Sequence, residues 1–371
     1  MFLRYLPLSN TRGRLKKVTI LATLAVLIIL RSIELLQSLM NIRPSIPNDE
    51  QPHYLHRSKF RTNPDMEYES HLSSAMRIIE RKEQYIYGDD EASDILWQML
   101  LEDKLTHENR GQDSLLMEER NAEWIYKVSM TSNAEANFGS LATLYHSYPH
   151  FVQRSDLLRY LILWYFGGYY ADMDVIPSRS IKDCPAIQES TERNNSDISL
   201  ILGIEIDEPF ASSQEMKFWH WVRRYGFAQY TMYAARRFSP LLREVIVRVI
   251  SHTNRHLDES NIFLGPQYNE MTTLELTGPG VFTDAILDVL SDSLPDFHPL
   301  VTKSINADIG IGDLDSPKQR VSWAPFHRLQ QPFCVEGSET RSGKDFGGLC
   351  ILPVNVWANG QRHSNSRFQY C

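Results

Sequence analysis

SDLLRYLILWYFGGYYADMD, residues 155–174, is the stretch of this sequence that says most about its fold. The spacing of its leucines and aromatic residues predicts a helix over 153–166. Gly167 and Gly168 end that helix, because the residue after a helix often needs a positive φ, which glycine adopts freely. A short aromatic strand is then expected over 169–174, so the chain passes directly from helix to strand.

Two aspartates stand one residue apart at the end of this strand. Side chains alternate along a strand, so Asp172 and Asp174 point to the same side with their Cα atoms about 7 Å apart. Carboxylate oxygens are the ligands that Mg²⁺ and Mn²⁺ prefer in proteins. An ion held by only two protein carboxylates keeps positions for phosphate oxygens. The pair therefore predicts a divalent metal at a nucleotide-sugar diphosphate site.

An acid and a base lie on one face of the preceding helix, at Asp156 and Arg159. We expect both to reach the pocket of the aspartate pair, where the planar guanidinium suits phosphate or ribose oxygens. The alternative is a solvated helix pair, which contributes only about 0.2–0.5 kcal/mol. Tyr169 and Tyr170 could form a platform for a ligand, or they could be ordinary core residues of the strand, since aromatic residues suit both roles.

The order of these features resembles the signature of the sugar-transferring D-x-D glycosyltransferases, D-L-L-R-Y-L-I-L-x-x-x-G-G-x-Y-x-D-x-D. Within that group the chain is most similar to the fungal Golgi α-1,6-mannosyltransferases that initiate outer chains. ILWQ at 95–98 resembles the family's first strand, and TGPGVFTDA at 277–285 resembles its T-G-P-G block. LGIE at 202–205 and FAQYT at 227–231 resemble a further conserved block. The resemblance covers residues 94–364.

This resemblance implies a GT-A-like α/β fold, with a single mainly parallel, Rossmann-like sheet flanked by helices. It also implies a metal-dependent retaining enzyme that moves mannose from GDP-mannose to a mannose-containing glycan, with the N-glycan outer chain as the favoured acceptor. Asp174 would bind Mn²⁺ or Mg²⁺ directly, and Asp172 would hold the sugar or ribose and contact the metal through water. The other implied site residues are catalytic Asp284 and donor-binding Asp156, Arg159, Tyr170, Gly168, Glu205 and His363. For His363, an ordinary surface histidine is the alternative.

The chain also departs from the family pattern. Ser93 and Asp94 replace the usual I-P-K before the first strand, and 99–101 replace the T-W after it. Related chains continue past the equivalent of 362–364 to a G-S-W-type motif that closes the diphosphate site, whereas this sequence stops at Cys371. Several alternatives stay open: a truncated sequence, a transferase for another sugar or a glycolipid acceptor, or a weakened or non-catalytic relative. Such a relative would bind glycan or nucleotide sugar in a complex with other mannosyltransferases.

Phosphohydrolases with an aspartyl nucleophile are an alternative of a different class, because they also carry D-x-D. Their motif follows a continuous apolar strand and has threonine or valine two residues after the second aspartate. Here Gly167 and Gly168 almost adjoin the motif, and Ile176 occupies that later position. The sequence therefore disfavours this class.

Composition limits the partners of this protein. The chain has 371 residues, of which 42% are hydrophobic, enough for one large or two small domains. Its net charge of −8 argues against a nucleic-acid partner, which would require a basic surface. An acidic protein that binds an anionic nucleotide sugar must neutralise it locally, by a metal ion and by arginine.

The N-terminus has the pattern of a membrane anchor. Residues 1–17 contain five lysines or arginines and no acid, and an apolar run follows over 18–30 and resumes after Arg31. We expect a cytosolic tail at 1–17, a signal-anchor helix at 18–40, a stem at 41–90 and a lumenal glycosyltransferase domain at 91–371. No A-x-A-like site follows the run, which favours an anchor over a cleaved signal peptide. The expected location is the Golgi membrane, with type II topology.

The remaining sequence supports an α/β domain in an oxidising compartment. Cys334 and Cys350 are the favoured disulfide pair among four cysteines, the alternative being that all four are free. A glycosylation sequon lies at 194–196. Buried strands are expected at 199–206 and 349–356, and helices at 218–233, 240–252 and 280–291. Strands alternating with helices indicate a mainly parallel sheet, whose ligands bind at the carboxyl ends of its strands.

Overall fold

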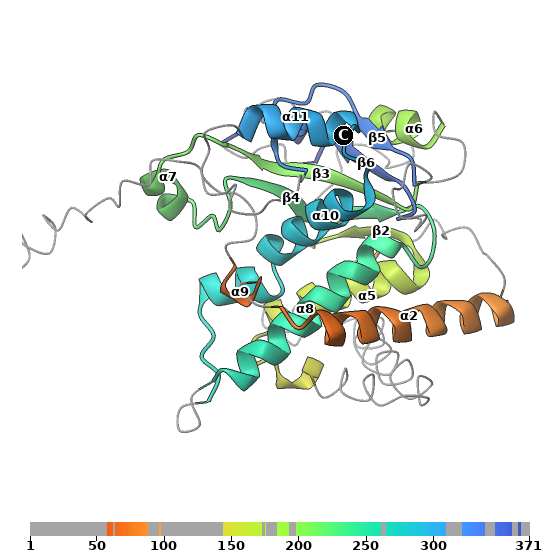
Figure 1. The fold of residues 1–371 in the computed structure, drawn as a ribbon, viewed down its shortest axis with the longest axis vertical. Coiled ribbons are helices and arrows are strands. Elements are labelled where there is room, and N and C mark those ends of the chain that lie inside the picture. Colours follow the sequence, from red (N-terminus) through yellow and green to blue (C-terminus); the bar gives the residue numbers. More distant parts are fainter. Residues whose placement is uncertain are drawn as a thin grey trace, which may run out of the picture. The chain divides into compact units, whose positions relative to one another are not determined.

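A mixed sheet forms the centre of this protein, and helices cover both of its faces (Figure 1). The structure is a computed structural model. It describes residues 58–61, 64–87, 96–97, 144–172, 175, 184–192, 198–260, 265–308, 321–337, 346–357 and 363–364. The described strands are β1 (Leu96–Trp97), β2 (Gly168–Ala171), β3 (Leu200–Asp207), β4 (Tyr225–Ala234), β5 (Phe333–Val335) and β6 (Leu349–Leu352).

The helices among these residues vary widely in length. The longer ones are α2 (Met66–Tyr87), α5 (Phe151–Phe166), α8 (Pro240–Asp258), α10 (Pro279–Ser293) and α11 (Pro299–Asp308). The shorter ones are α6 (Pro185–Glu192), α7 (Ser213–Phe218), α9 (Glu270–Leu276) and α12 (Val354–Trp357). Two 3₁₀ turns lie at η1 (Lys59–Arg61) and η4 (Ala324–Phe326), and the described residues 144–147 are also helical.

The sheet is mixed rather than mainly parallel, so that part of the predicted fold class is wrong. Its strand order is β1-β2-β4-β3-β6-β5. The pairs β1–β2 and β3–β6 are parallel, whereas β2–β4, β3–β4 and β5–β6 are antiparallel. The reason is the link from β3 to β4, which contains only the short helix α7. Antiparallel neighbours accept such a link, whereas parallel neighbours need a crossover, usually a long helix across the sheet.

The predicted helix at 218–233 is wrong, because most of this segment is strand β4. The strand pairs with β2 on one side and β3 on the other, placing Met232 opposite both Tyr170 and Leu202. Its aromatic residues and threonine suit a pleated surface between two neighbours better than they suit a helix. The apolar residues of this segment are therefore those of a central strand that is buried on both faces.

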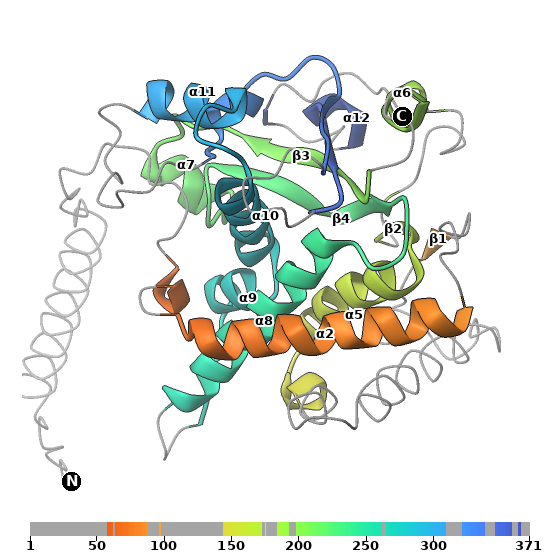
Figure 2. The same ribbon diagram turned by 45° about the vertical axis from the view of Figure 1, so that its right-hand side comes forward.

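Alternating side chains of the strands divide the core between the two faces of the sheet. In β3, Leu200 and Leu202 join the larger core cluster, and Ile201 joins the smaller one. Helices α5, α8 and α10 supply the larger cluster, whereas α6 and α12 contribute to the smaller one (Figure 2). The α/β class predicted from the sequence is thus confirmed.

Several predicted elements are confirmed with shifted ends. Helix α5 ends where Gly167 and Gly168 take positive φ angles of 67° and 91°. Strand β2 starts at the second glycine and ends at Ala171, shorter than the predicted 169–174. Strand β6 is also shorter than predicted, because Pro353 follows its last residue and α12 begins directly afterwards. The first family strand corresponds to β1, parallel to β2 at one edge of the sheet.

Helix α2 packs against the folded unit, although we expected its residues to belong to a separate stem. Leu72, Met76 and Ile79 are buried in the larger core cluster. Glu80 accepts hydrogen bonds from Arg243 of α8 and from the indole Nε1 of Trp164 in α5. The apolar stripe of α2 is large enough to pack against the core of the folded unit. The described residues all lie within the unit Gln51–Cys371.

The predicted disulfide between Cys334 and Cys350 is confirmed, with the two residues opposite each other on β5 and β6. Cys184 is also disulfide-bonded, so the alternative of four free thiols is wrong. Among the described residues no helix combines the length and apolarity that a membrane span requires. The predicted anchor at 18–40, the tail at 1–17 and the sequon at 194–196 lie outside the described residues. These assignments stay predictions.

Candidate active site

Asp172 lies directly after strand β2, at the carboxyl end where the sequence predicted a site. Its backbone N–H donates to the carbonyl of Tyr230 on β4 over 2.8 Å, which fixes the turn beyond the strand. The hydroxyl of Tyr170, two residues earlier on the same side of β2, donates to Asp172 Oδ1 over 2.7 Å. The side chain of Asp172 is 31% exposed, so a ligand can reach it. Its predicted partner Asp174 lies outside the described residues.

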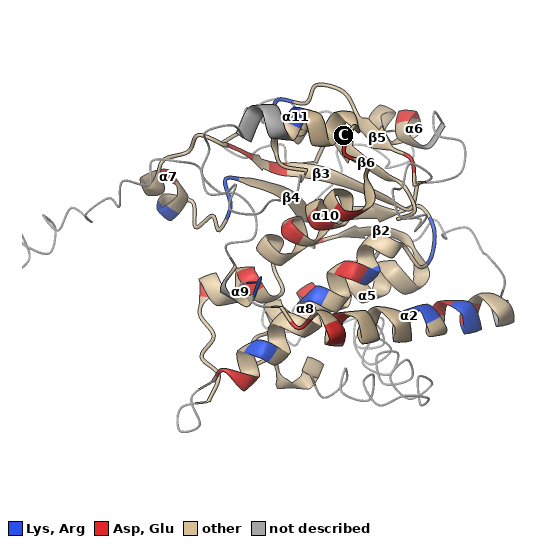
Figure 3. Cartoon of the chain, in the orientation of Figure 1, with Lys and Arg blue, Asp and Glu red and all other residues tan. Residues whose placement is uncertain are grey.

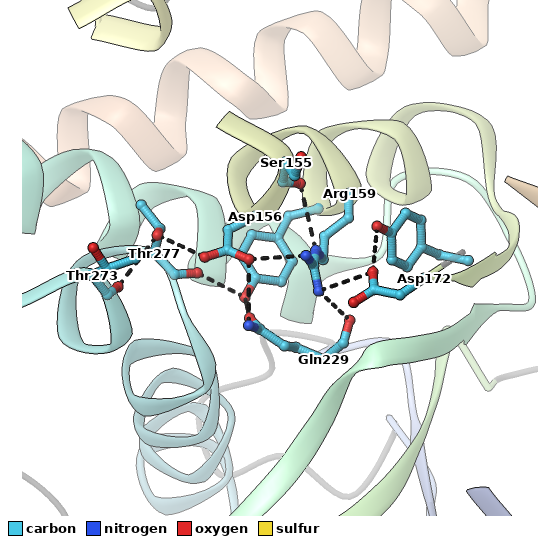
Figure 4. Close-up of polar contacts among 9 residues, drawn as sticks. Ser155, Asp156, Arg159, Asp172, Gln229, Thr273 and Thr277 are labelled. Atoms are coloured by element: carbon cyan, nitrogen blue, oxygen red, sulfur yellow. Dashed lines mark hydrogen bonds and ion pairs between the residues drawn. The ribbon is translucent and has the colours of Figure 1, made fainter. Parts of the chain in front are cut away.

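Arg159 joins the helix to this strand end (Figure 4). Its guanidinium lies 3.0 Å from Asp156 Oδ1 and 3.5 Å from Asp172 Oδ1. It also donates to the backbone carbonyl of Gln229 over 3.2 Å, and its Cζ lies 5.1 Å from the centroid of the Tyr170 ring. These contacts bring together four of the predicted site residues: Asp156, Arg159, Tyr170 and Asp172.

The Asp156–Arg159 pair is buried, with exposed fractions of 1% and 5%, so the alternative of a solvated helix pair is wrong. Figure 3, in which acidic residues are red and basic residues blue, shows charges of both signs along the neighbouring helices α2 and α8. Asp156 accepts further hydrogen bonds from Thr277 Oγ1 over 2.8 Å and from Gln229 Nε2 over 3.4 Å. Burial raises the pKa of Asp156 to about 7, while Arg159 and the Thr277 hydrogen bond act in the opposite direction.

The T-G-P-G block contributes to the site through its threonine. Thr277 caps α9 and contacts α5, and Pro279 begins α10. A Cβ on Gly278 would lie 2.8 Å from Leu274 Cα, and one on Gly280 would lie 2.9 Å from Leu274 O. Both atoms belong to backbone, so only glycine permits this close approach of the two helices. The turn thereby holds Thr277 against Asp156.

Asp284 makes its strongest contacts away from this network. It has no exposed surface and forms an ion pair of 2.6 Å with Arg223, which also binds Glu275 through two hydrogen bonds. These contacts give Asp284 a clear role in joining α10 to the start of β4. Its assignment as a catalytic residue stays a prediction.

The other predicted donor-binding residues occupy different places. Gly168 begins β2, four residues before Asp172 and therefore about 13 Å from it along the strand. Glu205 and His363 both line a pocket of about 780 Å³ beside β3 and β4. Burial raises the pKa of Tyr230, and the charges of Glu205 and Asp172 both add to that increase.

Sequence reasoning missed three residues of this arrangement. Gln229 and Thr277 were inside quoted motifs, but only the folded structure shows that strand β4 and the turn after α9 bring them to Asp156. Tyr160 donates to the carbonyl of Thr277 over 3.0 Å and to the side-chain oxygen of Gln229. It lies one residue after Arg159, in the motif itself, and its tyrosine hydroxyl on a buried helix face was the available signal.

The donor set around Asp172 fits a divalent ion of the Mg²⁺ type. Asp172 offers a carboxylate that is partly exposed and oriented by a tyrosine hydroxyl and an arginine. Among the residues that the structure describes, no group of three or more His, Cys, Asp or Glu side chains is placed to hold an ion by itself. Magnesium-like ions commonly use one or two protein carboxylates together with substrate phosphates, and this arrangement suits that mode.

The partly exposed carboxylate at the end of β2, oriented by a buried arginine, is the candidate binding group of this α/β fold. Comparison with known proteins identifies the type of site. The family described as "Glycosyltransferase sugar-binding region containing DXD motif" matches residues 54–193, which include Asp156, Arg159, Asp172 and Asp174. The resemblance predicted from the sequence is thus confirmed, and residues 54–193 are similar to a DXD-type sugar-binding region.

Named relatives come from yeasts. A putative glycosyltransferase of Saccharomyces cerevisiae, HOC1, is 30% identical over 51% of this chain and 40% of its own length. The initiation-specific alpha-1,6-mannosyltransferase of Schizosaccharomyces pombe is 28% identical over 64% of this chain and 48% of its own length. The protein of the same name from Candida albicans is 26% identical over 53% and 47%. The chain therefore spans less than half the length of these relatives.

Proposed function

We propose that this protein is a hexosyltransferase that moves mannose from GDP-mannose to a mannose-containing glycan, with N-glycan outer chains as the acceptor class. The observation that carries the proposal is the carboxylate of Asp172 at the end of β2, held by Tyr170 and Arg159 within the DXD-type region. The names of the yeast relatives support the sugar and the reaction class.

In the proposed reaction, the bond between the anomeric carbon of mannose and the diphosphate oxygen breaks, and its electron pair stays on GDP. A new bond forms between that carbon and an acceptor hydroxyl oxygen, with retention of configuration. The proton of that hydroxyl leaves to the diphosphate or to solvent. The products are GDP and a glycan longer by one mannose.

The residues of this chain bind and orient the donor in that scheme. Asp172 and Asp174 would hold Mn²⁺ or Mg²⁺, which when bound would supply positive charge that stabilises the diphosphate leaving group. Arg159 fixes the orientation of the Asp172 carboxylate through their 3.5 Å contact. Asp156, buried behind Arg159, keeps the guanidinium in place through their 3.0 Å ion pair. A positioned carboxylate of this kind lowers the reorganisation needed when the donor reacts.

Donor hydrolysis by the purified full chain tests this function. We expect release of GDP from GDP-mannose that requires Mn²⁺ and increases when a mannose oligosaccharide is added. UDP-glucose and UDP-galactose serve as donor controls. Asp258→Asn, an exposed acid at the far end of α8, is the matched control for Asp172→Asn. Metal-dependent GDP binding without turnover would instead indicate a non-catalytic relative, and turnover of another donor would correct the sugar.

We further propose that the protein is a type II protein of the Golgi membrane, anchored by residues 18–40, and that it acts beside other mannosyltransferases. The basic flank and the apolar run of the sequence support this location. Resistance of the full chain to extraction by alkaline carbonate, together with glycan on Asn194, is the expected result. A secreted form that starts near residue 41 would show a cleaved signal peptide.

A further inference from the structure

The pocket of about 780 Å³ beside the strand end has a wall of aromatic rings. Its volume falls within the range typical of small-molecule sites. Trp219 and Trp221 stack with their centroids 5.8 Å apart and their planes 12° from parallel. His363 meets both rings edge-on, with centroid distances of 5.2 and 4.8 Å. The mostly exposed ring of Phe218 extends this wall beyond Trp219.

The end of α7 builds this wall by its backbone geometry. The N–H of Trp221 donates to the carbonyl of Met216 over 2.9 Å, and the N–H of His220 donates to Lys217 over 3.4 Å. This is the Schellman pattern of helix ends, which requires the intervening residue to be left-handed. His220 fills that position with a φ of 59°, a conformation that is unfavourable for a non-glycine residue. The turn places the two indoles on either side of His220, facing each other.

Strand β4 connects this pocket to the donor end of the site. Gly226 lines the pocket, Gln229 contacts Asp156, and the carbonyl of Tyr230 accepts the N–H of Asp172. Gly226 and Tyr230 are four strand residues apart, about 13 Å. The T-G-P-G turn makes a second connection, because Thr277 binds Asp156 while Pro279 lines the pocket. The pocket therefore opens within the reach of a short oligosaccharide from Asp172.

The charges around the pocket favour a neutral ligand over an anionic one. Of the described residues that line it, Arg223 alone carries a fixed positive charge, and its guanidinium is held by Asp284 and Glu275. Glu205 also lines the pocket, and Glu270 pairs with His220 at 2.8 Å. Burial lowers the pKa of His363, which keeps its ring neutral at pH 7. Carboxylates beside aromatic rings repel a nucleoside diphosphate but accept hydrogen bonds from sugar hydroxyls.

We propose that this pocket binds the acceptor glycan, with a hexose ring packed against Trp219 and Trp221 and its hydroxyls donating to Glu205 and Glu270. A pyranose presents a face of C–H groups, which suits the electron-rich face of an indole. This assignment rests on the proposed function for its meaning as an acceptor site. Its binding step, however, is measurable without turnover.

The test is calorimetric titration of the full chain with mannotetraose in the absence of donor, and separately with GDP plus Mn²⁺. We expect Trp219→Ala and Trp221→Ala each to weaken mannotetraose binding at least tenfold while leaving GDP affinity within threefold of wild type. Trp219→Phe keeps an aromatic face and should retain mannotetraose affinity within about threefold. Phe297→Ala removes an aromatic residue that is 82% exposed outside the pocket, and should change neither affinity.

Two further observations keep the test decisive. His220→Gly preserves the left-handed turn and should retain the stacked indoles, so glycan binding should persist in this variant. Thermal unfolding of each variant identifies any loss of fold, and Trp221→Ala decides the question if Trp219→Ala unfolds. Unchanged glycan affinity in folded Trp219→Ala, weakened GDP binding instead, or no mannotetraose binding by wild type would each overturn the proposal. Failure of donor hydrolysis with intact glycan binding would overturn only the proposed enzyme.

Discussion

Thr277 donates a hydrogen bond of 2.8 Å to Asp156, across 121 residues of sequence. This contact ties the T-G-P-G turn to helix α5, and Asp156 in turn holds Arg159 against Asp172. The two motifs that carry the family resemblance are therefore joined physically. Each buried group of this network has a hydrogen-bonding partner on a neighbouring helix, strand or turn. The network therefore holds the partly exposed carboxylate of Asp172 in a fixed position.

Thr277→Val removes the hydroxyl while keeping the shape of the side chain. Because a buried acceptor then loses a donor, we expect the free energy of unfolding to fall by about 1–3 kcal/mol. The pKa of Asp156 should also rise further, since the lost hydrogen bond favours its ionised form. Urea unfolding at pH 8 measures the first effect. Thr302→Val, at an exposed position of α11, should change stability by less than about 0.5 kcal/mol.

The raised pKa of Asp156 predicts a pH dependence of stability. The folded protein holds this proton up to a pKa of about 7, against an ordinary value of 3.8 in the unfolded chain. The folded state therefore binds more protons between these values. The contribution of the Asp156 carboxyl group to the free energy of unfolding is full below pH 4 and is lost as the pH rises through 7. The free energy of unfolding should change by at most about 1.4 kcal/mol per pH unit in this range.

Comparison with Asp156→Asn isolates this effect from other titrating groups. Denaturant midpoints of both proteins between pH 4 and pH 8 should show the wild type losing stability relative to the variant as the pH rises. Asp258→Asn replaces an exposed aspartate and should follow the wild-type profile. Parallel curves for wild type and Asp156→Asn would show that this carboxyl keeps an ordinary pKa.

The local motif was readable from the sequence because its signals are short-range. Helix α5, its glycine stop and the Asp172 strand end follow from periodicity and from the φ requirement at Gly167. Burial of Asp156 was not readable, because an i,i+3 ion pair has the same sequence whether water or β4 covers it. The partners Gln229 and Thr277 are 73 and 121 residues away from it.

Global arrangement was harder to predict, for a physical reason visible in β4 and α2. A central strand covered on both faces loses the polar–apolar alternation that identifies a strand, so 218–233 resembled an aromatic helix. Helix α2 is highly charged, yet Glu80 is neutralised by Arg243 and its Leu72 and Met76 are buried. Its charges are used in tertiary ion pairs, which composition alone cannot distinguish from a solvated stem.

Replacement of either aspartate of the D-x-D pair tests the metal assignment. Asp172→Asn and Asp174→Asn keep the side-chain volume but remove a charged ligand, so we expect each to lower transfer by more than about tenfold, with Asp174→Asn abolishing it. Far-UV circular dichroism should be unchanged. Activity above a tenth of wild type in Asp174→Asn would remove that residue from the site. Asp258→Asn provides the baseline.

Arg159 should matter for stability as well as for donor binding, since it lies between a buried and a partly exposed carboxylate. Arg159→Ala leaves Asp156 buried without its cation, which costs about 3–5 kcal/mol. The double variant Asp156→Asn/Arg159→Ala should recover part of that loss, giving a coupling free energy of about 1 kcal/mol or more. Glu259→Ala, which breaks the exposed pair with Arg255, should cost less than about 1 kcal/mol. Additive losses at Asp156 and Arg159 would contradict the network.

Tyr170→Phe separates orientation of the metal ligand from packing of the strand. The change removes the hydroxyl that donates to Asp172 Oδ1 over 2.7 Å but keeps the ring beneath Arg159. We expect a loss of stability below about 1.5 kcal/mol and a loss of Mn²⁺-dependent GDP affinity of about 10- to 100-fold, because partners that orient a ligand have effects of this size. Calorimetric titration with GDP and Mn²⁺ measures the second quantity.

The neighbouring Tyr169 stacks on Tyr233 at 4.0 Å and packs against the other core cluster, so Tyr169→Phe is the matched control and should keep full affinity. Equal affinities for the two variants would mean that Asp172 is oriented by Arg159 and the strand alone.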